Sequence, residues 1–415
     1  MDNLARFISD HMGDDTSRLL LAKDKWPDID MQLAVNCIES RRKLKGKVNE
    51  WHDNPSLIFP VRLSAEQCSS SATAQYKASL ADRIMAGGEW KIADLTGGLG
   101  VDSWFFSQKA EKVLYNEMQT VLCDSSRHNF KALGADNIEV SNAAVGNSAD
   151  ETSPSALLGD FRPDIIYMDP ARRGEGGRKV FLIEECTPDI LTLKEELFTI
   201  SRHILVKLSP MADISMACGR LGPCCREVHI VATGGECKEL LIWMDREWNG
   251  EYSVHAIELP AGYPLSEPAQ FSFIPSEELA LPFILKDDDN TPMYLFEPGK
   301  ALMKAGAFNL ISTRFGIPKL GRSTHYYVLD DPKKIREIKG SGKIYQIIRC
   351  EPLNKRSMKE AGKDFPKAEV TARNIPMDTD TLRKKLGVTS GDDAHIFGLK
   401  SDRLGNLLLC TNRVF

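Results

Sequence analysis

The stretch Ile92-Ala-Asp-Leu-Thr-Gly-Gly-Leu-Gly-Val-Asp102 decides the fold of this chain. Residues 89–95 predict a short strand, and residues 101–110 predict the helix after it. Three glycines, Gly97, Gly98 and Gly100, lie between them. A strand, a glycine turn and a helix form the first unit of a doubly wound sheet, whose ligands lie at the carboxyl ends of the strands. The turn therefore predicts either a ligand site or a tight turn without a ligand, and the rest of the chain has to distinguish the two.

Two cofactor classes use such a turn. A dinucleotide fold requires G-x-G-x-x-G, but Ser103 occupies the third glycine position when the count starts at Gly98. The remaining pattern, D-x-x-x-G-x-G from Asp94, resembles motif I of class I S-adenosylmethionine-dependent methyltransferases, in which the amino acid end of the cofactor lies over the glycines. The resemblance implies six cofactor-binding residues in this stretch: Asp94, Thr96, Gly97, Gly98, Gly100 and Asp102.

Alternating strands and helices follow the turn. Strands are predicted over residues 112–117, 137–141, 163–169 and 203–208, with helices over 118–133 and 189–202. Residues 226–233 and 239–245 are too close in sequence for a helical crossover, so they predict an antiparallel pair across Gly234-Gly235. An α/β sheet that ends in this way resembles the seven-stranded, Rossmann-like sheet of class I methyltransferases. A dinucleotide fold would continue in parallel.

Polar residues follow the predicted strands at the edge where the turn lies. Glu117 stands 23 residues after Asp94, and an acidic side chain at this spacing accepts hydrogen bonds from ribose hydroxyls. We assign Glu117 and the adjacent Met118 to the cofactor; the alternative for Glu117 is a solvated strand end. Asn142 and Ala143 follow the third strand, where many methyltransferases carry an aspartate for the adenine amino group. An asparagine accepts that bond through its amide oxygen.

The fourth strand ends in Asp169-Pro-Ala-Arg-Arg-Gly174, which resembles motif IV (D/N-P-P-x) of nucleic-acid methyltransferases, with Ala171 in place of the second proline. We assign Asp169, Pro170, Arg172 and Lys207 to catalysis. Arg172 matches the D-P-P-R form of uridine C5 methylases, whose chemistry needs a cysteine nucleophile. The corresponding segment after the fifth strand, Lys207-Leu-Ser-Pro-Met211, has no cysteine.

These motifs favour direct in-line methyl transfer to a nitrogen or oxygen, with Asp169 as proton acceptor. Lys207 and the arginines at positions 172, 173 and 178 are candidates to hold a phosphate or the cofactor carboxylate. The alternative for these basic residues is surface charge on a glycine-rich loop.

Composition limits the class of protein. With 42% hydrophobic and 27% charged residues, and no stretch of about 20 apolar residues, the chain predicts a cytoplasmic protein without a membrane span. Its ten cysteines form no C-x-x-C pair. The group Cys218, Cys224, Cys225 and Cys237 has no histidine at zinc-ligand spacing, so we expect reduced thiols and no metal site.

Charge is distributed unevenly along the chain. Residues 314–415 hold 21 Lys and Arg against 12 Asp and Glu, a net charge of +9, so the rest carries −14 of the total of −5. Basic residues gather in two predicted helices, at 355, 356, 359 and 363 and at 383–385. A basic tail on an acidic body favours a polyanionic partner such as RNA, which proteins read by shape and phosphate contacts. The alternative is a solvated surface.

The whole pattern resembles a bacterial group of class I methyltransferases with a helical N-terminal region, a ferredoxin-like domain and a C-terminal THUMP-like domain. The resemblance implies four parts: an N-terminal helical region (1–65), the S-adenosylmethionine-dependent methyltransferase domain (66–259), a small ferredoxin-like α+β domain (260–330) and a THUMP-like RNA-binding domain (331–415). It implies methylation of tRNA or rRNA. A methyltransferase for protein or small molecules, and a non-catalytic RNA-binding protein with this fold, are the alternatives.

Overall fold

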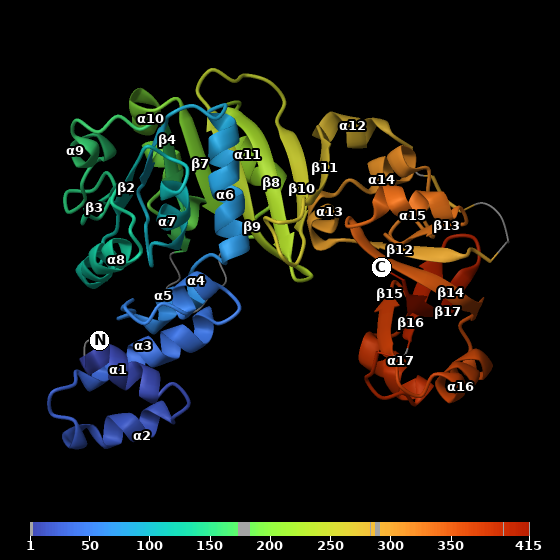
Figure 1. Ribbon diagram of the computed structural model, residues 1–415. Coiled ribbons are helices and arrows are strands. Elements are labelled where there is room, and N and C mark those ends of the chain that lie inside the picture. Colours follow the sequence, from blue (N-terminus) through green and yellow to red (C-terminus); the bar gives the residue numbers. More distant parts are fainter. Residues whose placement is uncertain (1–2, 173–182, 283, 287–290, 393, 415) are drawn as a thin grey trace. The chain divides into compact units, whose positions relative to one another are not determined.

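A computed structural model describes residues 3–172, 183–282, 284–286, 291–392 and 394–414 (Figure 1). The chain divides into two compact units. The first contains residues 1–228 and 239–251, and the second contains residues 229–238 and 252–415. None of the described helices is long and apolar enough to cross a membrane.

The first unit begins with helices, as the sequence predicts, and continues as alternating strands and helices. Its elements are α1 (Asn3–Asp10), α2 (Thr16–Leu21), η1 (Lys23–Lys25), α3 (Met31–Leu44), α4 (Asn49–His52), α5 (Arg62–Gln67), α6 (Ser71–Ile84), β1 (Lys91–Asp94), α7 (Val101–Ser107), β2 (Lys112–Asn116), α8 (Thr120–Ala132), β3 (Ile138–Ser141), α9 (Pro154–Leu158), β4 (Ile165–Met168), β5 (Ala171–Arg172), η3 (Ile183–Glu185), β6 (Cys186–Thr187), α10 (Ile190–Ile200), β7 (His203–Leu208) and α11 (Ile214–Leu221).

The larger sheet has the order β11-β10-β8-β9-β7-β4-β1-β2-β3. Strands β3, β2, β1, β4 and β7 are parallel neighbours, whereas β9 (Glu236–Asp245) runs antiparallel to β7. The predicted hairpin is formed by β8 (Cys225–Thr233) and β9, which are neighbours. This confirms the predicted strand order of class I methyltransferases. The sheet is larger than the seven strands expected, because β10 (Ser253–Leu259) and β11 (Ala269–Phe273) extend it.

Helices α6 and α7 pack against each other beside this sheet. The serine run before α6 predicts an N-cap. Ser70 Oγ accepts the Thr73 N–H at 3.3 Å, and Thr73 Oγ1 accepts the Ser70 N–H at 3.2 Å. Such a capping box stabilises a helix start by about 1 kcal/mol. The capped start fixes where α6 begins, and with it which of its side chains face α7 and the sheet.

The second unit is built around a six-stranded sheet of order β13-β12-β14-β17-β16-β15. Its elements after β11 are α12 (Pro275–Ala280), β12 (Tyr294–Pro298), α13 (Lys300–Ala305), α14 (Phe308–Phe315), β13 (Tyr327–Leu329), α15 (Pro332–Ile338), β14 (Gly342–Pro352), α16 (Lys355–Asp364), β15 (Glu369–Arg373), α17 (Thr379–Leu386), β16 (His395–Ser401) and β17 (Gly405–Arg413). Because β12 pairs with β14, one sheet crosses the boundary that the sequence predicts at residue 330.

Helices α16 and α17 lie together on the sheet of the second unit. Their apolar residues, among them Met358, Ala361 and Leu382, share one core with strands β15 to β17. Gly362 allows the close approach of the two helices, since a Cβ there would lie 1.7 Å from the Leu386 carbonyl oxygen. The lysines of both helices, at positions 355, 359, 363, 384 and 385, are exposed.

Candidate active site

The glycine turn between β1 and α7 has a packing reason for two of its glycines. A Cβ at Gly97 would lie 2.1 Å from the ring of Tyr115, and one at Gly100 would lie 2.8 Å from the ring of Phe130. Gly100 also has φ +92°, in the left-handed region that disfavours a side chain. These two glycines would therefore be needed even in a turn without a ligand.

Gly98 is the glycine with open space beside it. Its φ is +55°, and a Cβ there would meet nothing closer than the Thr96 carbonyl oxygen at 4.0 Å. Its N–H donates to Glu117 Oε2 at 3.0 Å, and Glu117 Oε1 accepts the Gln119 N–H at 2.8 Å. Each carboxylate oxygen has a second lone pair, so Glu117 can still accept ribose hydroxyls. The open side of the turn and Glu117 thus lie together.

Asp94 lies beneath the turn. It is 1% exposed, accepts the Thr96 N–H at 3.0 Å, and accepts the Ser103 hydroxyl at 2.6 Å. Burial raises the pKa of the Asp94 carboxyl to about 7, against the lowering effect of these two hydrogen bonds. The structure therefore gives Asp94 the role of bracing the turn, and Ser103, the residue that excluded a dinucleotide motif, is its partner.

Two asparagines hold the ends of the neighbouring strands. Asn116 donates to the carbonyl oxygens of Leu95 and Ala143 and accepts the Ala143 N–H, so it connects the ends of β1, β2 and β3. Asn142 donates to the Glu117 and Met118 carbonyl oxygens at 2.7 and 3.1 Å. Sequence reasoning missed Asn116. It placed Asn142 at the adenine, whereas its observed bonds position the backbone around Glu117.

Exposed apolar side chains stand next to Glu117. Met118 is 63% exposed and Val121 is 48% exposed. Large apolar side chains left in water at a ligand edge are suited to cover a flat apolar group such as a purine ring. Met118 was predicted as a cofactor residue, and its exposure is compatible with that role.

Asp169 and Lys207 meet at the carboxyl ends of β4 and β7. The Lys207 ammonium forms an ion pair with Asp169 Oδ2, and the Asp169 N–H donates to Thr96 Oγ1 at 2.6 Å. Burial would lower the pKa of Lys207, but the carboxylates of Asp169, Asp102 and Glu239 raise it above its ordinary value. Pro170 is buried directly after Asp169. The predicted motif IV is thus bonded to the glycine turn.

Asp102 faces a buried polar network rather than the open side of the turn. Its Oδ2 accepts the hydroxyls of Ser69 and Tyr167 at 3.0 and 2.9 Å, and its Oδ1 lies 3.3 Å from the Lys77 ammonium. Lys77 also contacts both oxygens of Glu239 at 2.9 Å. Sequence reasoning missed all of these partners of Asp102. A signal was present, because Lys77 falls among the apolar positions of α6.

The basic loop after motif IV is described only at its start. Arg172 belongs to the short strand β5, which pairs with β6. The predicted arginines at positions 173 and 178 lie outside the described residues.

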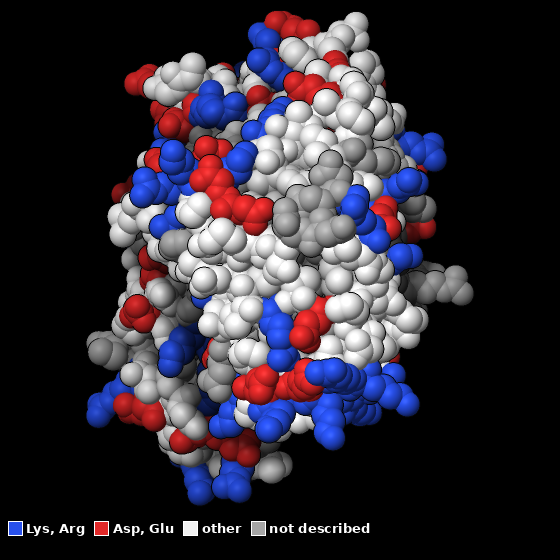
Figure 2. Space-filling model, turned by 90° about the vertical axis from the view of Figure 1, so that its right-hand side faces the viewer, with Lys and Arg blue, Asp and Glu red and all other residues white. Residues whose placement is uncertain are grey.

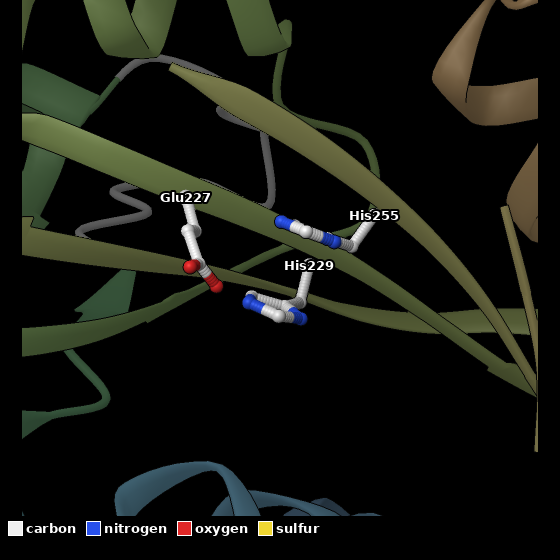
Figure 3. Close-up of side chains that lie close together, drawn as sticks. All are labelled: Glu227, His229 and His255. Atoms are coloured by element: carbon white, nitrogen blue, oxygen red, sulfur yellow. The ribbon is translucent and has the colours of Figure 1, made fainter. Parts of the chain in front are cut away.

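A group of possible metal ligands that was not predicted consists of Glu227 and His229 on β8 and His255 on β10 (Figure 3). Both oxygens of Glu227 contact the guanidinium of Arg83. The ring nitrogens of His255 lie 2.8 Å from two serine hydroxyls. The two imidazoles stack with an interplanar angle of 10°, so their in-plane lone pairs do not converge on one point. Polar partners and ring stacking therefore account for this group.

The four cysteines that were considered as a zinc group are free thiols, and Cys218 and Cys225 are buried. Each of the ten cysteines in the chain is free.

The strand order and the polar edge formed by β1, β2, β4 and β7 define a class I methyltransferase fold. Comparison with protein families adds two domains. Residues 294–334 match the model of a ferredoxin-like domain, and residues 342–412 match that of a THUMP-like domain.

Similar proteins agree with this class. The chain is 29% identical to a protein of Porphyromonas gingivalis W83 that is provisionally named a methyltransferase; the crystal structure of that protein aligns with a TM-score of 0.83 over 99% of this chain and 98% of the other. It is also 22% identical over 350 residues, 83% of this chain and 86% of the relative, to uncharacterised S-adenosylmethionine-dependent methyltransferases from the CDC 1551 and H37Rv strains of Mycobacterium tuberculosis.

Proposed function

We propose that the protein is a cytoplasmic S-adenosylmethionine-dependent methyltransferase that methylates a base nitrogen or oxygen of structured RNA, either tRNA or rRNA. The observation that carries the proposal is the Asp169–Lys207 ion pair at the carboxyl edge of a class I sheet, bonded through Thr96 to the glycine turn. The names of the relatives and the THUMP-like match support the cofactor and the RNA substrate, respectively.

The residues around the turn fit this cofactor. Gly98 leaves open space where a side chain would fill the cradle, Glu117 has acceptor capacity for ribose hydroxyls, and Met118 is an exposed apolar cover for adenine. Asp94, Thr96 and Asn116 hold these residues in place without having to contact the ligand. When bound, S-adenosylmethionine supplies an electrophilic methyl group on a sulfonium.

Asp169 and Lys207 have different roles toward the group that accepts the methyl. Lys207 engages Asp169 Oδ2 in an ion pair. We assign Asp169 Oδ1 to the substrate, where it orients the nucleophilic nitrogen or oxygen and accepts its proton. For direct transfer the protein has only to align the nucleophile with the methyl group and to accept its proton at Asp169.

The properties of Cys68, the thiol near Asp102 and Lys207, disfavour a covalent cysteine route. Cys68 is close enough for the charges of Asp102 and Lys207 to act on it, but burial raises its pKa, and its thiol donates to the Ala65 carbonyl oxygen at 3.3 Å. A thiol with a raised pKa is a weak nucleophile at neutral pH. This supports in-line transfer.

The RNA side of the proposal rests on the second unit. Lys355, Lys359 and Lys363 are exposed and lie four residues apart, so they form a row on α16 opposite its buried face. On the face drawn in Figure 2, Lys and Arg side chains gather in the lower part, with Asp and Glu side chains among them. Rows of lysine contact phosphates without reading sequence, which suits recognition of an RNA fold.

The test uses purified full-length protein, S-adenosylmethionine labelled in the methyl group, and total RNA from cells that lack the gene. We expect label in a tRNA or rRNA fraction, its loss with D169N, and no transfer to RNA from cells that carry the gene. Label in protein or in small molecules, but not in RNA, would contradict the substrate. Binding of RNA with no binding of S-adenosylmethionine would instead favour the non-catalytic alternative.

A further inference from the structure

Five ionisable side chains of the first unit lie on the same side of the larger sheet: Lys77, Asp102, Asp169, Lys207 and Glu239. In the parallel β4–β7 register Met168 is opposite Val206, so Asp169 and Lys207 are level with each other. In the antiparallel β7–β9 register Lys207 is opposite Leu241. Glu239 is two residues from Leu241 and therefore faces the same side as Lys207. We call these five residues the charge array.

The array is held by short contacts. The Lys77 ammonium lies 2.9 Å from each oxygen of Glu239 and 2.9 Å from Ser69 Oγ. These bonds use its donors, and Asp102 Oδ1 is left with a charge contact at 3.3 Å and no hydrogen bond of its own. The side chains of Lys77, Glu239 and Asp102 are 0%, 3% and 11% exposed. Because of this burial, solvent screens these three groups weakly, whereas the side chains of Lys207 and Asp169 are 15% and 38% exposed.

The array contains three carboxylates and two ammonium groups. Burial raises the pKa of Glu239 above its ordinary value, against the lowering effect of Lys77, and the contact of both its oxygens with the Lys77 ammonium favours the carboxylate form. Burial would raise the pKa of Asp102, but Lys77 and Lys207 lower it below its ordinary value. The array thus carries one negative charge in excess. Asp94 lies beneath the glycine turn, which Thr96 connects to Asp169, and it adds a partial negative charge at neutral pH. Excess buried charge is unfavourable until a cation offsets it.

We propose that the charge array makes Asp102 and Glu239 specificity-determining residues that favour the sulfonium cofactor over its neutral thioether product, S-adenosylhomocysteine. The inference rests on the proposed function, because it takes the cofactor to bind at the turn to which Asp169 is bonded. Methyl transfer removes the positive charge of the sulfonium. The same array that attracts the cofactor then holds the product less tightly, which assists its release.

The test is calorimetric titration of the full-length protein with three ligands: S-adenosylmethionine, S-adenosylhomocysteine, and the analogue with an amino group in place of the methylated sulfonium. We expect the two cationic ligands to bind more tightly than the neutral one. E239Q and D102N should each reduce that preference by roughly fivefold to tenfold, because each removes one buried negative charge. Both variants keep the shape and an acceptor oxygen for Lys77 or Ser69.

The matched control is E111Q. Glu111 is half-exposed, pairs with Lys91 at 3.7 Å and precedes β2, at the edge of the sheet opposite to the array. Its replacement makes the same change of charge and should leave the preference as in the wild type. Thermal unfolding verifies that each variant is folded.

The outcomes separate this inference from the proposed function. Wild-type binding without a preference for cations, or an unchanged preference in folded E239Q and D102N, would overturn the inference alone. Failure of the wild type to bind any of the three ligands would overturn the cofactor site and the inference with it.

Discussion

Two regions of the molecule are rich in charge, and they differ in how each charge is held. In the charge array of the first unit, Lys77 has named partners at 2.9 to 3.3 Å and no exposure to water. On α16 of the second unit, Lys355, Lys359 and Lys363 extend into solvent. Removing one partner of a buried ion pair costs much of the stability of the fold, because the other charge stays buried without compensation. Exposed charges contribute roughly additively to the binding of a charged partner, and salt screens their effect. Four experiments follow; the first and the last test this difference directly, and the other two test buried carboxylates at the glycine turn.

The largest effect is expected from K77M. Removal of one partner from a buried ion pair leaves Glu239 and Asp102 uncompensated, so we expect a loss of about 3 to 5 kcal/mol in the free energy of unfolding, measured by urea denaturation. The control is K109M, since Lys109 is partly exposed and pairs with Asp82 at 3.4 Å. That change should cost less than about 1 kcal/mol. Equal losses in the two variants would remove the distinction between buried and exposed charge.

A second effect concerns the pH dependence of stability. The pKa of Asp94 is about 7 in the folded chain and near 3.9 in an unfolded one, so the folded state binds more protons between these values, and stability falls as pH rises through this window. D94N removes this slope. Relative to the wild type, we expect the variant to gain about 2 to 3 kcal/mol between pH 5 and pH 8 in urea denaturation. A constant difference between the two proteins would show that Asp94 ionises normally in the folded state.

The third effect is on cofactor affinity. E117A removes the acceptor for the ribose hydroxyls and the bond to Gly98, so S-adenosylmethionine should bind about 10- to 100-fold more weakly. The control is E139A, because Glu139 is exposed on β3 and pairs with Lys112 at 2.8 Å. Calorimetry on both variants checks the assignment. Wild-type affinity in E117A would exclude Glu117 from the site.

The smallest effect per residue is expected on α16. The triple variant K355Q/K359Q/K363Q should bind bulk tRNA about tenfold more weakly at physiological salt and show a shallower dependence on salt, with a free energy of unfolding within about 0.5 kcal/mol of the wild type. Filter binding over a range of salt concentrations measures both quantities.

The control for α16 is K109Q/K112Q/K131Q, which removes the same number of charges from the first unit. An equal loss of RNA affinity in both triple variants would mean that net charge alone, and not the α16 surface, binds the RNA.

Much of the sheet was predictable from the chain. The glycine turn, the alternation of strands and helices, and the two runs too close for a crossover predict the class I order, because these signals are local in sequence. Residues 260–330 were less predictable. Their strands are short, and β12 is completed by pairing with β14, nearly fifty residues later in the chain. The seven expected strands became nine for the same reason, since edge pairing is a tertiary event.

The candidate site divides in the same way. The chain alone indicates Glu117, Asp169 and Lys207, since residues that follow parallel strands gather at one edge. It could not show that Gly97 accommodates Tyr115, that Asp94 lies buried under the turn, or that Asn142 positions the Glu117 backbone. These facts depend on how side chains from different elements pack together, and the spacing of residues in a motif does not determine that packing.

The sequence by itself determined the order of the elements and the polar residues at their ends, because hydrophobic period and glycine position act over a few residues. Only the tertiary structure decided that Lys77 meets Glu239, 162 positions away. That contact requires α6 to lie over β9, and β9 to pair antiparallel with β7 in one register, so that an ammonium buried on a helix finds a carboxylate on the same face of the sheet. The burial of both groups makes the pairing obligatory.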